Sequence, residues 1–126
     1  MEKQIIQTNA APAPIGPYSQ AVKVNGLLFI SGQVCINPAT GELNNADVTT
    51  EAHQVMRNLR VLLQEAGMDF SHVVKTTIFL SDMALFNEVN QVYGSYFSGS
   101  FPARETVAAK GLPRNVNVEI SVIAAA

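Results

Sequence analysis

The chain has 126 residues, a length typical of one domain, and we predict a single domain over residues 1–126. Its apolar content of 48% excludes a disordered linker, and its net charge of −2, with scattered lysines and arginines, argues against nucleic-acid binding. Only 14% of the residues are charged, against about 25% in an average soluble domain. This low charge content predicts that further copies of the chain cover part of its surface.

The compartment follows from cysteine usage and from the absence of long apolar runs. The single cysteine, Cys35, cannot form an internal disulfide, which favours a reducing compartment. His53 and His72 have no cysteines near them, so we predict no metal site. The sequence contains neither a signal peptide at its start nor a run of about 18 apolar residues that could span a membrane. We therefore expect a cytoplasmic protein with no membrane partner.

The first third of the sequence predicts strands joined by turns. A short strand is expected over 3–7, followed by a loop over 9–18 that contains three prolines. The dipeptide Asn25-Gly26 is the one that a two-residue type I′ hairpin turn prefers, and it separates two apolar runs at 21–24 and 27–34. These runs are predicted to form a hairpin.

A helix is predicted to begin at Val48, where apolar residues start to recur with a period of 3.6 residues. Asp47 is expected to cap its first turn, and Gly67 stands where a helix-ending glycine belongs. The residues predicted for its polar face are Glu51, Gln54, Arg57, Arg60 and Glu65.

The second half of the sequence predicts a buried strand over 73–80 and a second helix near 83–97, capped by Asp82. Two further strands, over 104–109 and 116–123, close the chain. This order of elements predicts an α+β fold, in which two helices pack on one face of a single mixed sheet. The other sheet face is expected to pack against another subunit.

Two charged residues stand out as candidates for chemistry. Arg104 enters a strand after Phe-Pro-Ala, and an arginine can grip a carboxylate through two parallel hydrogen bonds, although a surface ion pair is its commoner role. Glu119 lies in the most apolar strand, where a carboxylate must be paired, hydrogen-bonded or functional. If the last two strands form an antiparallel hairpin with Thr106 opposite Glu119, Arg104 lies diagonal to Glu119 on the same face. A structural salt bridge is then the alternative to a ligand site.

Four polar or flexible residues form a second group of candidates. Asn90 interrupts an otherwise aromatic helix face, so its amide either bonds to a neighbouring segment or contacts a ligand. Gly32, inside a strand, suggests that another group approaches the backbone closely. Ser31 adjoins it, and Tyr18 on the proline-rich loop can donate a well-placed hydrogen bond. Turn formation and packing are the alternative roles of these residues.

An ordered series of segments resembles the Rid (reactive intermediate deaminase, YjgF-type) family, which is also described as L-PSP endoribonucleases or translation inhibitors. The resemblance covers nearly the whole chain, and its most specific part is an arginine after Pro-Ala together with a glutamate in the final strand. The segments are IGPYSQ (15–20), LLFISGQ (27–33), PATGEL (38–43), NLRVLLQEAG (58–67), VVKTTIFLSDM (73–83), VNQVY (89–93), FPARETV (101–107) and VEISVIA (118–124).

The resemblance implies a chorismate-mutase-like fold and a homotrimer with ligand sites between subunits. It also implies hydrolysis of enamine and imine acids of the 2-aminoacrylate and 2-iminobutyrate type to 2-oxo acids and ammonia, without a metal or organic cofactor. Dehydratases that depend on pyridoxal phosphate release such intermediates. Arg104 would hold the substrate carboxylate, while Glu119 and the main-chain carbonyl of Thr106 would position the attacking water. The residues implied to line the cleft are Tyr18, Ser31, Gly32 and Asn90.

Two positions depart from the family pattern. Members often have a small residue directly after the arginine and a cysteine next but one, where this chain has Glu105 and Thr106. The carbonyl at 106 does not depend on the side chain, whereas Glu105 adds negative charge near the cleft unless it points to the opposite strand face. A non-catalytic small-molecule-binding or chaperone-like trimer and an endoribonuclease or translation inhibitor remain the alternatives to an imine deaminase.

Overall fold

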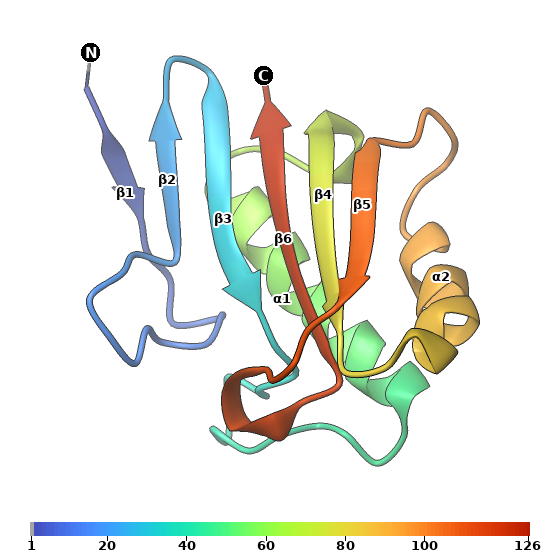
Figure 1. The fold of residues 1–126 in the computed structure, drawn as a ribbon. Coiled ribbons are helices and arrows are strands. Elements are labelled where there is room, and N and C mark those ends of the chain that lie inside the picture. The colour runs from blue at the N-terminus through green and yellow to red at the C-terminus, as the bar shows by residue number, and fades with distance from the viewer. Residues whose placement is uncertain (1) are drawn as a thin grey trace.

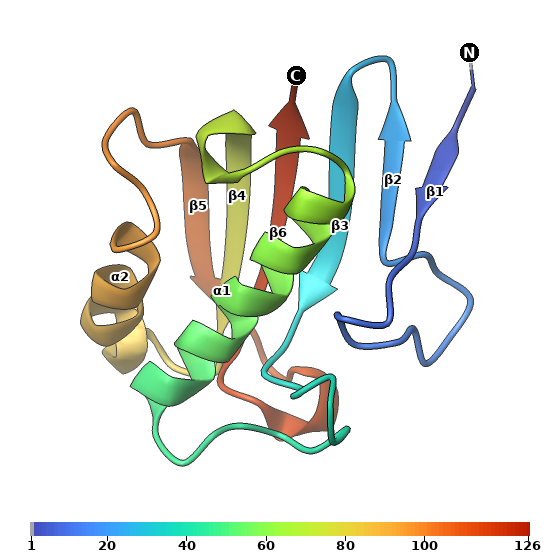
Figure 2. The same cartoon turned by 180° about the vertical axis from the view of Figure 1, so that it is seen from behind.

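The computed structural model describes residues 2–126, which form a six-stranded sheet with the order β1-β2-β3-β6-β4-β5 (Figure 1). The strands are β1 (Gln4–Ile6), β2 (Ala21–Val24), β3 (Leu27–Gln33), β4 (Val73–Leu80), β5 (Ala103–Ala108) and β6 (Val118–Ala125). The helices are α1 (Val48–Glu65) and α2 (Phe86–Gly94), with short 3₁₀ turns η1 (Phe70–His72), η2 (Met83–Leu85) and η3 (Pro113–Asn115). Figure 2 shows α1 and α2 on the same face of the sheet, so the predicted α+β architecture is confirmed.

The elements with strong local signals form as predicted. Asn25 and Gly26 have φ angles of 52° and 77°, and positive φ at both positions is what a type I′ turn between β2 and β3 requires. α1 begins where the Asp47 carboxylate accepts a hydrogen bond from the Thr50 N–H at 2.7 Å. It ends just before Gly67, whose φ of 77° suits a helix-terminating glycine.

The second predicted helix is divided into two parts. Asp82 accepts a hydrogen bond from the Ala84 N–H at 2.8 Å and caps η2, and α2 follows directly. α2 ends at Gly94, before the predicted end at Phe97. Phe97 then packs edge-on against Phe70, with ring centroids 5.4 Å apart. After Gly94 the chain continues in tighter turns, in which the Tyr96 N–H donates to the Tyr93 carbonyl at 3.1 Å and the Phe97 N–H to the Gly94 carbonyl at 3.2 Å.

The two closing strands do not form the predicted hairpin. β5 pairs in parallel with β4, with Arg104 beside Thr76, whereas β6 runs antiparallel between β3 and β4 with Glu119 opposite Phe79. The expected diagonal contact of Arg104 with Glu119 on one sheet face is therefore wrong. Parallel neighbours need a long crossover, and α2 supplies it between β4 and β5. β5 consequently lies at the sheet edge instead of beside β6.

The polar face predicted for α1 is also partly wrong, because Glu51 is fully buried and Gln54 is 6% exposed. The Glu51 carboxylate accepts hydrogen bonds from the main-chain N–H groups of Asn117 and Val118, at 2.7 and 2.9 Å. It accepts a third from the Asn117 side-chain amide at 3.1 Å. A buried carboxylate is tolerated when its lone pairs are satisfied in this way. Glu51 thus ties the first turn of α1 to the start of β6.

The face of the sheet opposite the helices carries no helix in residues 2–126 and faces the viewer in Figure 1. Leu27 and Phe29 of β3 and Val107 of β5 alternate with inward-facing neighbours and are 37%, 41% and 45% exposed. Apolar side chains gathered on one sheet face are typical of a surface that another molecule covers. In the same residues, no helix has the length and apolarity needed to cross a bilayer.

Glu51→Ala is expected to lower the free energy of unfolding by about 3 kcal/mol, because the N–H groups of Asn117 and Val118 lose a charged acceptor. Glu65→Ala, at an exposed position of the same helix, is the matched control and is expected to change stability by less than about 0.5 kcal/mol. Urea denaturation of both variants measures the difference. Equal midpoints for the two variants would contradict the structural role of Glu51.

Candidate functional site

A hollow of about 390 Å³ opens at the end of β3 and contains the Glu119 side chain. Its walls come from the loop over 12–18, the last residues of β3, β6 and the loop that precedes β6. Four residues implied by the family resemblance line this hollow together, namely Tyr18, Ser31, Gly32 and Glu119. The structure thus brings most of the candidate residues to one place although they are distant in sequence.

A bulge in β3 shapes the floor of this hollow. Ile30 pairs with Val122 and Gln33 with Ile120, so one more residue lies between the pairs on β3 than on β6. A Cβ atom at Gly32 would lie 2.9 Å from Cδ and 3.1 Å from Cγ of Glu119. The close approach that the glycine predicted is therefore made by the Glu119 side chain, and any larger residue at position 32 would displace it.

The Glu119 carboxyl is electrostatically unusual. It is half-buried and forms no ion pair within residues 2–126. Burial raises the pKa of this carboxyl above its ordinary value of 4.5, because the hollow solvates a charge less well than water does. A carboxylate with raised proton affinity and free lone pairs is suited to accepting a proton from a bound water.

Gln20 holds the loop that forms one wall of the hollow, and we did not predict it from sequence. Its buried amide nitrogen donates to the carbonyls of Thr8 and Pro12, each at 2.9 Å, and its amide oxygen accepts from the Thr8 N–H at 2.8 Å. The Ser31 hydroxyl donates to the Ser19 carbonyl at 2.6 Å and so fastens the same loop to β3. A glutamine between a proline-rich loop and a strand was the available signal, since it can donate and accept at once.

Arg104 lies in a separate hollow, lined by Asn90, Tyr93, Gly94, Phe101 and Pro102. Its guanidinium carbon is 5.1 Å from the Tyr93 ring centroid and 5.6 Å from that of Phe86, both residues of α2. The Tyr93 hydroxyl donates to Thr76 Oγ1 at 2.9 Å, which fixes the ring beneath the cation, and burial raises the pKa of this phenol. Arg104 forms no ion pair in the described residues, so its donors remain available to an anion.

The two positions after Arg104 point in opposite directions. Thr106 follows on the Arg104 side of β5, and its Oγ1 is the one buried side-chain polar atom without a hydrogen-bond partner in residues 2–126. Glu105 points to the other face, where it accepts from the Thr77 hydroxyl at 2.9 Å and lies 3.1 Å from Lys75 Nζ. These contacts, the Thr77 hydrogen bond first, lower the pKa of Glu105. Its charge is therefore directed away from Arg104.

The two hollows do not share a residue, and they lie on different sides of the sheet. Arg104 packs on α2, whereas Glu119 alternates with the inward-facing Val118 and Ile120 and projects from the uncovered face. Their strands are separated by β4, which places the two backbones about 10 Å apart. Within one chain, Arg104 and Glu119 therefore do not form a common site.

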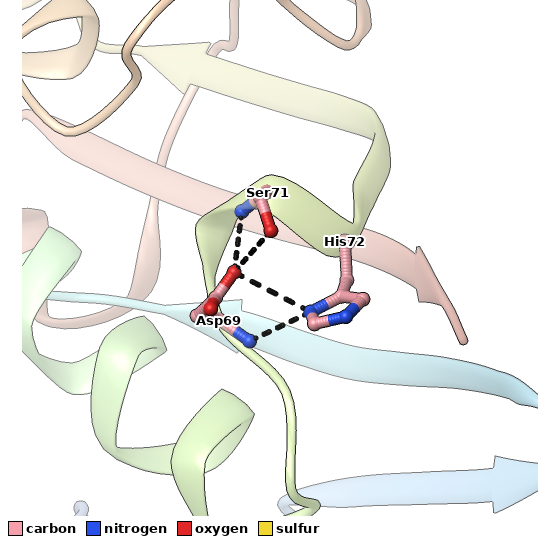
Figure 3. Close-up of polar contacts among 3 residues, drawn as sticks. All are labelled: Asp69, Ser71 and His72. Atoms are coloured by element: carbon pink, nitrogen blue, oxygen red, sulfur yellow. Dashed lines mark hydrogen bonds and ion pairs between the residues drawn. The ribbon is translucent and has the colours of Figure 1, made fainter.

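A further group, Asp69, Ser71 and His72, contains the residue types of a catalytic triad but not its geometry (Figure 3). The Ser71 hydroxyl donates to the Asp69 carboxylate, not to the histidine, and His72 Nδ1 accepts the Asp69 main-chain N–H at 3.0 Å. These contacts form a capping box that begins η1. Across residues 2–126, no three His, Cys, Asp or Glu side chains are grouped so that they could hold a metal ion.

Comparison with known proteins assigns the chain to a family. The sequence matches the family model described as Endoribonuclease L-PSP over residues 8–126. The chain belongs to the Rid (L-PSP) family. Among Rid relatives, the 2-iminobutanoate/2-iminopropanoate deaminase of Mus musculus is 49% identical over 97% of this chain and 90% of its own length. Protein DfrA of Myxococcus xanthus is 50% identical over 98% of this chain and 96% of its own.

Crystal structures of Rid proteins have the same fold. YyfA of Yersinia pestis, a protein of the Rid family, superimposes with a TM-score of 0.96 at 45% identity, covering 99% of this chain and all of that one. TdcF of E. coli, crystallised with bound serine, has a TM-score of 0.93 at 36% identity and covers 98% of each chain. The Rid resemblance and the fold predicted from it are confirmed. The relatives carry different names, so membership alone does not define the activity of this chain.

Glu119→Gln is expected to raise the melting temperature at neutral pH, because the variant no longer holds a half-buried charge. Below pH 4.5 the carboxyl is protonated in both the folded and the unfolded chain, so the two proteins should then melt alike. As the pH rises through the raised pKa, only the wild type must ionise a buried group, and the difference should grow. Thermal unfolding at pH 4 and pH 7.5 tests this; a difference independent of pH would contradict the raised pKa.

Proposed function

We propose that this chain hydrolyses short 2-imino and 2-enamine acids to 2-oxo acids and ammonium. The observation that carries the proposal is that Arg104 and Glu119 each lie unpaired in a hollow, one as an anion-binding cation and the other as a proton acceptor. The name of the mouse relative supports this reaction class. The serine bound to TdcF is an amino acid of the same small size.

The reaction requires few groups because an iminium carbon is already electrophilic. Arg104 binds the substrate carboxylate and fixes the carbon in position, while Glu119 accepts a proton from a water as its oxygen bonds to that carbon. The main-chain carbonyl of Thr106 orients the same water. Glu119 then passes this proton to the nitrogen of the tetrahedral intermediate, and the C–N bond breaks so that ammonia leaves. The hydroxyl that came from water loses its remaining proton and becomes the 2-oxo group, and ammonia takes up that proton to give ammonium. Tyr18, Ser31, Gly32 and Asn90 line the cleft, and the chemistry needs no metal or organic cofactor.

We further propose that the complete site forms between copies of the chain in a cyclic homotrimer, with Arg104 and Asn90 from one copy and Glu119 from the next. Ile15 and Phe101 are 77% and 63% exposed, and each lines one of the two hollows. Large apolar side chains at both rims favour the burial of the two hollows against each other. A ring of identical head-to-tail contacts pairs every Arg104 with a Glu119 from a neighbour.

The cellular setting follows from the substrate. Imine and enamine acids hydrolyse and react with other molecules, so they must be intercepted where they are released. Dehydratases that use pyridoxal phosphate supply them, and we propose that the protein acts beside such enzymes in the cytoplasm. The buried free thiol of Cys35 agrees with a reducing compartment, and burial raises its pKa to about 11, which keeps it protonated.

Adding the protein to a threonine dehydratase reaction should accelerate the release of 2-oxobutanoate from its imine. Arg104→Ala is expected to lower kcat/KM about a hundredfold, because a charge-assisted contact to the carboxylate is lost. Lys3→Ala, which also removes an exposed positive charge, is the control and should behave as wild type. Full activity of Arg104→Ala would refute the proposed mechanism, and 2-oxo acid binding without turnover would instead support a non-catalytic binding protein.

Mixing two inactive variants tests where the site lies. In trimers assembled from equal amounts of Arg104→Ala and Glu119→Gln, about a quarter of the interfaces combine an intact Arg104 with an intact Glu119. Refolding or co-expressing the two variants should therefore restore about a quarter of wild-type activity. Either variant refolded alone is the control. No recovery in mixed trimers would contradict a site shared between copies.

RNA cleavage is the second candidate, favoured by the description of the matched family as endoribonucleases. The net charge of −2 offers little attraction to a phosphate backbone, which makes this candidate weaker. RNA degradation that persists through purification and is lost in Arg104→Ala would favour it over deamination.

A further inference from the structure

The hollow that contains Glu119 also contains a second charged residue, Arg114, in the loop that leads into β6. Arg114 has a φ of 55°, and Asn115 after it has a φ of 57°, so two successive residues with side chains adopt the left-handed conformation. Hydrogen bonds from the Asn115 N–H to Leu112 at 3.1 Å and from the Val116 N–H to Pro113 at 3.3 Å hold this turn. Strained backbone of this kind persists only where the surroundings enforce it, and it clusters at ligand sites.

The Arg114 guanidinium has little bonding within the chain. It is exposed and donates one long hydrogen bond, at 3.3 Å, to the Gly41 carbonyl. Within residues 2–126 it forms no ion pair, although Glu119 lines the same hollow. Most of its N–H groups therefore have no acceptor within residues 2–126. The long hydrogen bond to Gly41 holds the side chain at the rim of the hollow.

The hollow is larger than the smallest imine acids require. On one chain the hollow has a volume of about 390 Å³ and is open at its mouth, so a substrate longer than three or four carbons fits beside Glu119. Part of the lining is apolar, with Pro12, Val34, Ile36 and Pro113 among its residues. A substrate side chain can thus extend along an apolar wall, and the cation available to its far end is Arg114.

We propose that Arg114 selects the substrate by its side chain, binding the distal carboxylate of a 2-imino dicarboxylic acid. The chain would then prefer imines derived from acidic amino acids to neutral imines of the same carbon number. A guanidinium binds a carboxylate through paired, charge-assisted hydrogen bonds, which a terminal methyl group cannot form. This inference rests on the proposed function, in which Arg104 of a neighbouring copy holds the first carboxylate.

The test compares two imines of equal chain length, generated in place by amino-acid oxidases from glutamate and from norvaline. Wild type should hydrolyse the glutamate-derived imine with a kcat/KM about tenfold higher. Arg114→Asn removes the guanidinium but keeps a residue that tolerates positive φ, so the turn should persist. It should reduce this ratio about tenfold, and Arg114→Lys, which keeps the charge without the fork, should reduce it less.

Binding of the oxo-acid products gives a second readout that does not depend on turnover. By calorimetry, 2-oxoglutarate should bind wild type more tightly than 2-oxopentanoate, and Arg114→Asn should remove the difference. Equal kcat/KM values for the two imines in wild type, or a ratio unchanged by Arg114→Asn, would overturn the inference and leave deamination intact. Turnover of neither these imines nor the threonine-derived imine would instead overturn the proposed function, and selective 2-oxoglutarate binding lost in Arg114→Asn would still support the Arg114 contact.

Discussion

The strand order β3-β6-β4-β5 separates Arg104 and Glu119 by one strand and directs their side chains to opposite faces of the sheet. Side chains alternate between faces along a strand, so a rotamer change cannot bring these two groups together. Any chemistry that uses both must therefore draw them from two copies of the chain. In the proposed assembly, the apolar residues at the rims of both hollows would exclude water where the two surfaces meet.

Buried polar contacts hold the segments that form the walls of the two hollows. Gln20 fastens the proline-rich loop, Glu51 fastens the start of β6, and the Tyr93–Thr76 hydrogen bond fixes the ring beneath Arg104. Each contact satisfies groups that would be costly to bury unpaired, so each favours one arrangement over near alternatives. Within residues 2–126, Arg104 and Glu119 form no ion pair, and Arg114 donates only one long hydrogen bond, to the Gly41 carbonyl. Hydrogen bonds within the chain thus hold the walls of the hollows, whereas the charged side chains that face the hollows can still bind a ligand.

The sequence predicted those elements whose signals lie within a few residues. A hairpin turn needs positive φ at Asn25-Gly26, and a helix end needs an Asp47 cap or a Gly67, so the local sequence suffices. The pairing of β5 was not predictable in this way, because apolar alternation identifies a strand but not its neighbour. The burial of Glu51 was missed for a related reason. Helical periodicity assigns a charged residue to the polar face, and the N–H groups that bind Glu51 lie far away in the sequence, at Asn117 and Val118.

The hairpin that would place Arg104 beside Glu119 does not form, yet both residues lie in hollows suited to a ligand. The family resemblance identified both residues without any assumption about strand pairing, because a sequence motif contains the residues whichever strands pair and whichever copy contributes them to the site. Neither the strand pattern nor the family motif points to Arg114, because a charged residue in a turn is common and only its positive φ and its place in the hollow set it apart. If the site is shared between copies, the residues proposed to carry out the reaction and the residue proposed to select the substrate lie in different parts of it. In that arrangement Arg104 and Glu119 would act across the interface, whereas Arg114 would reach the substrate side chain from the loop that leads into β6.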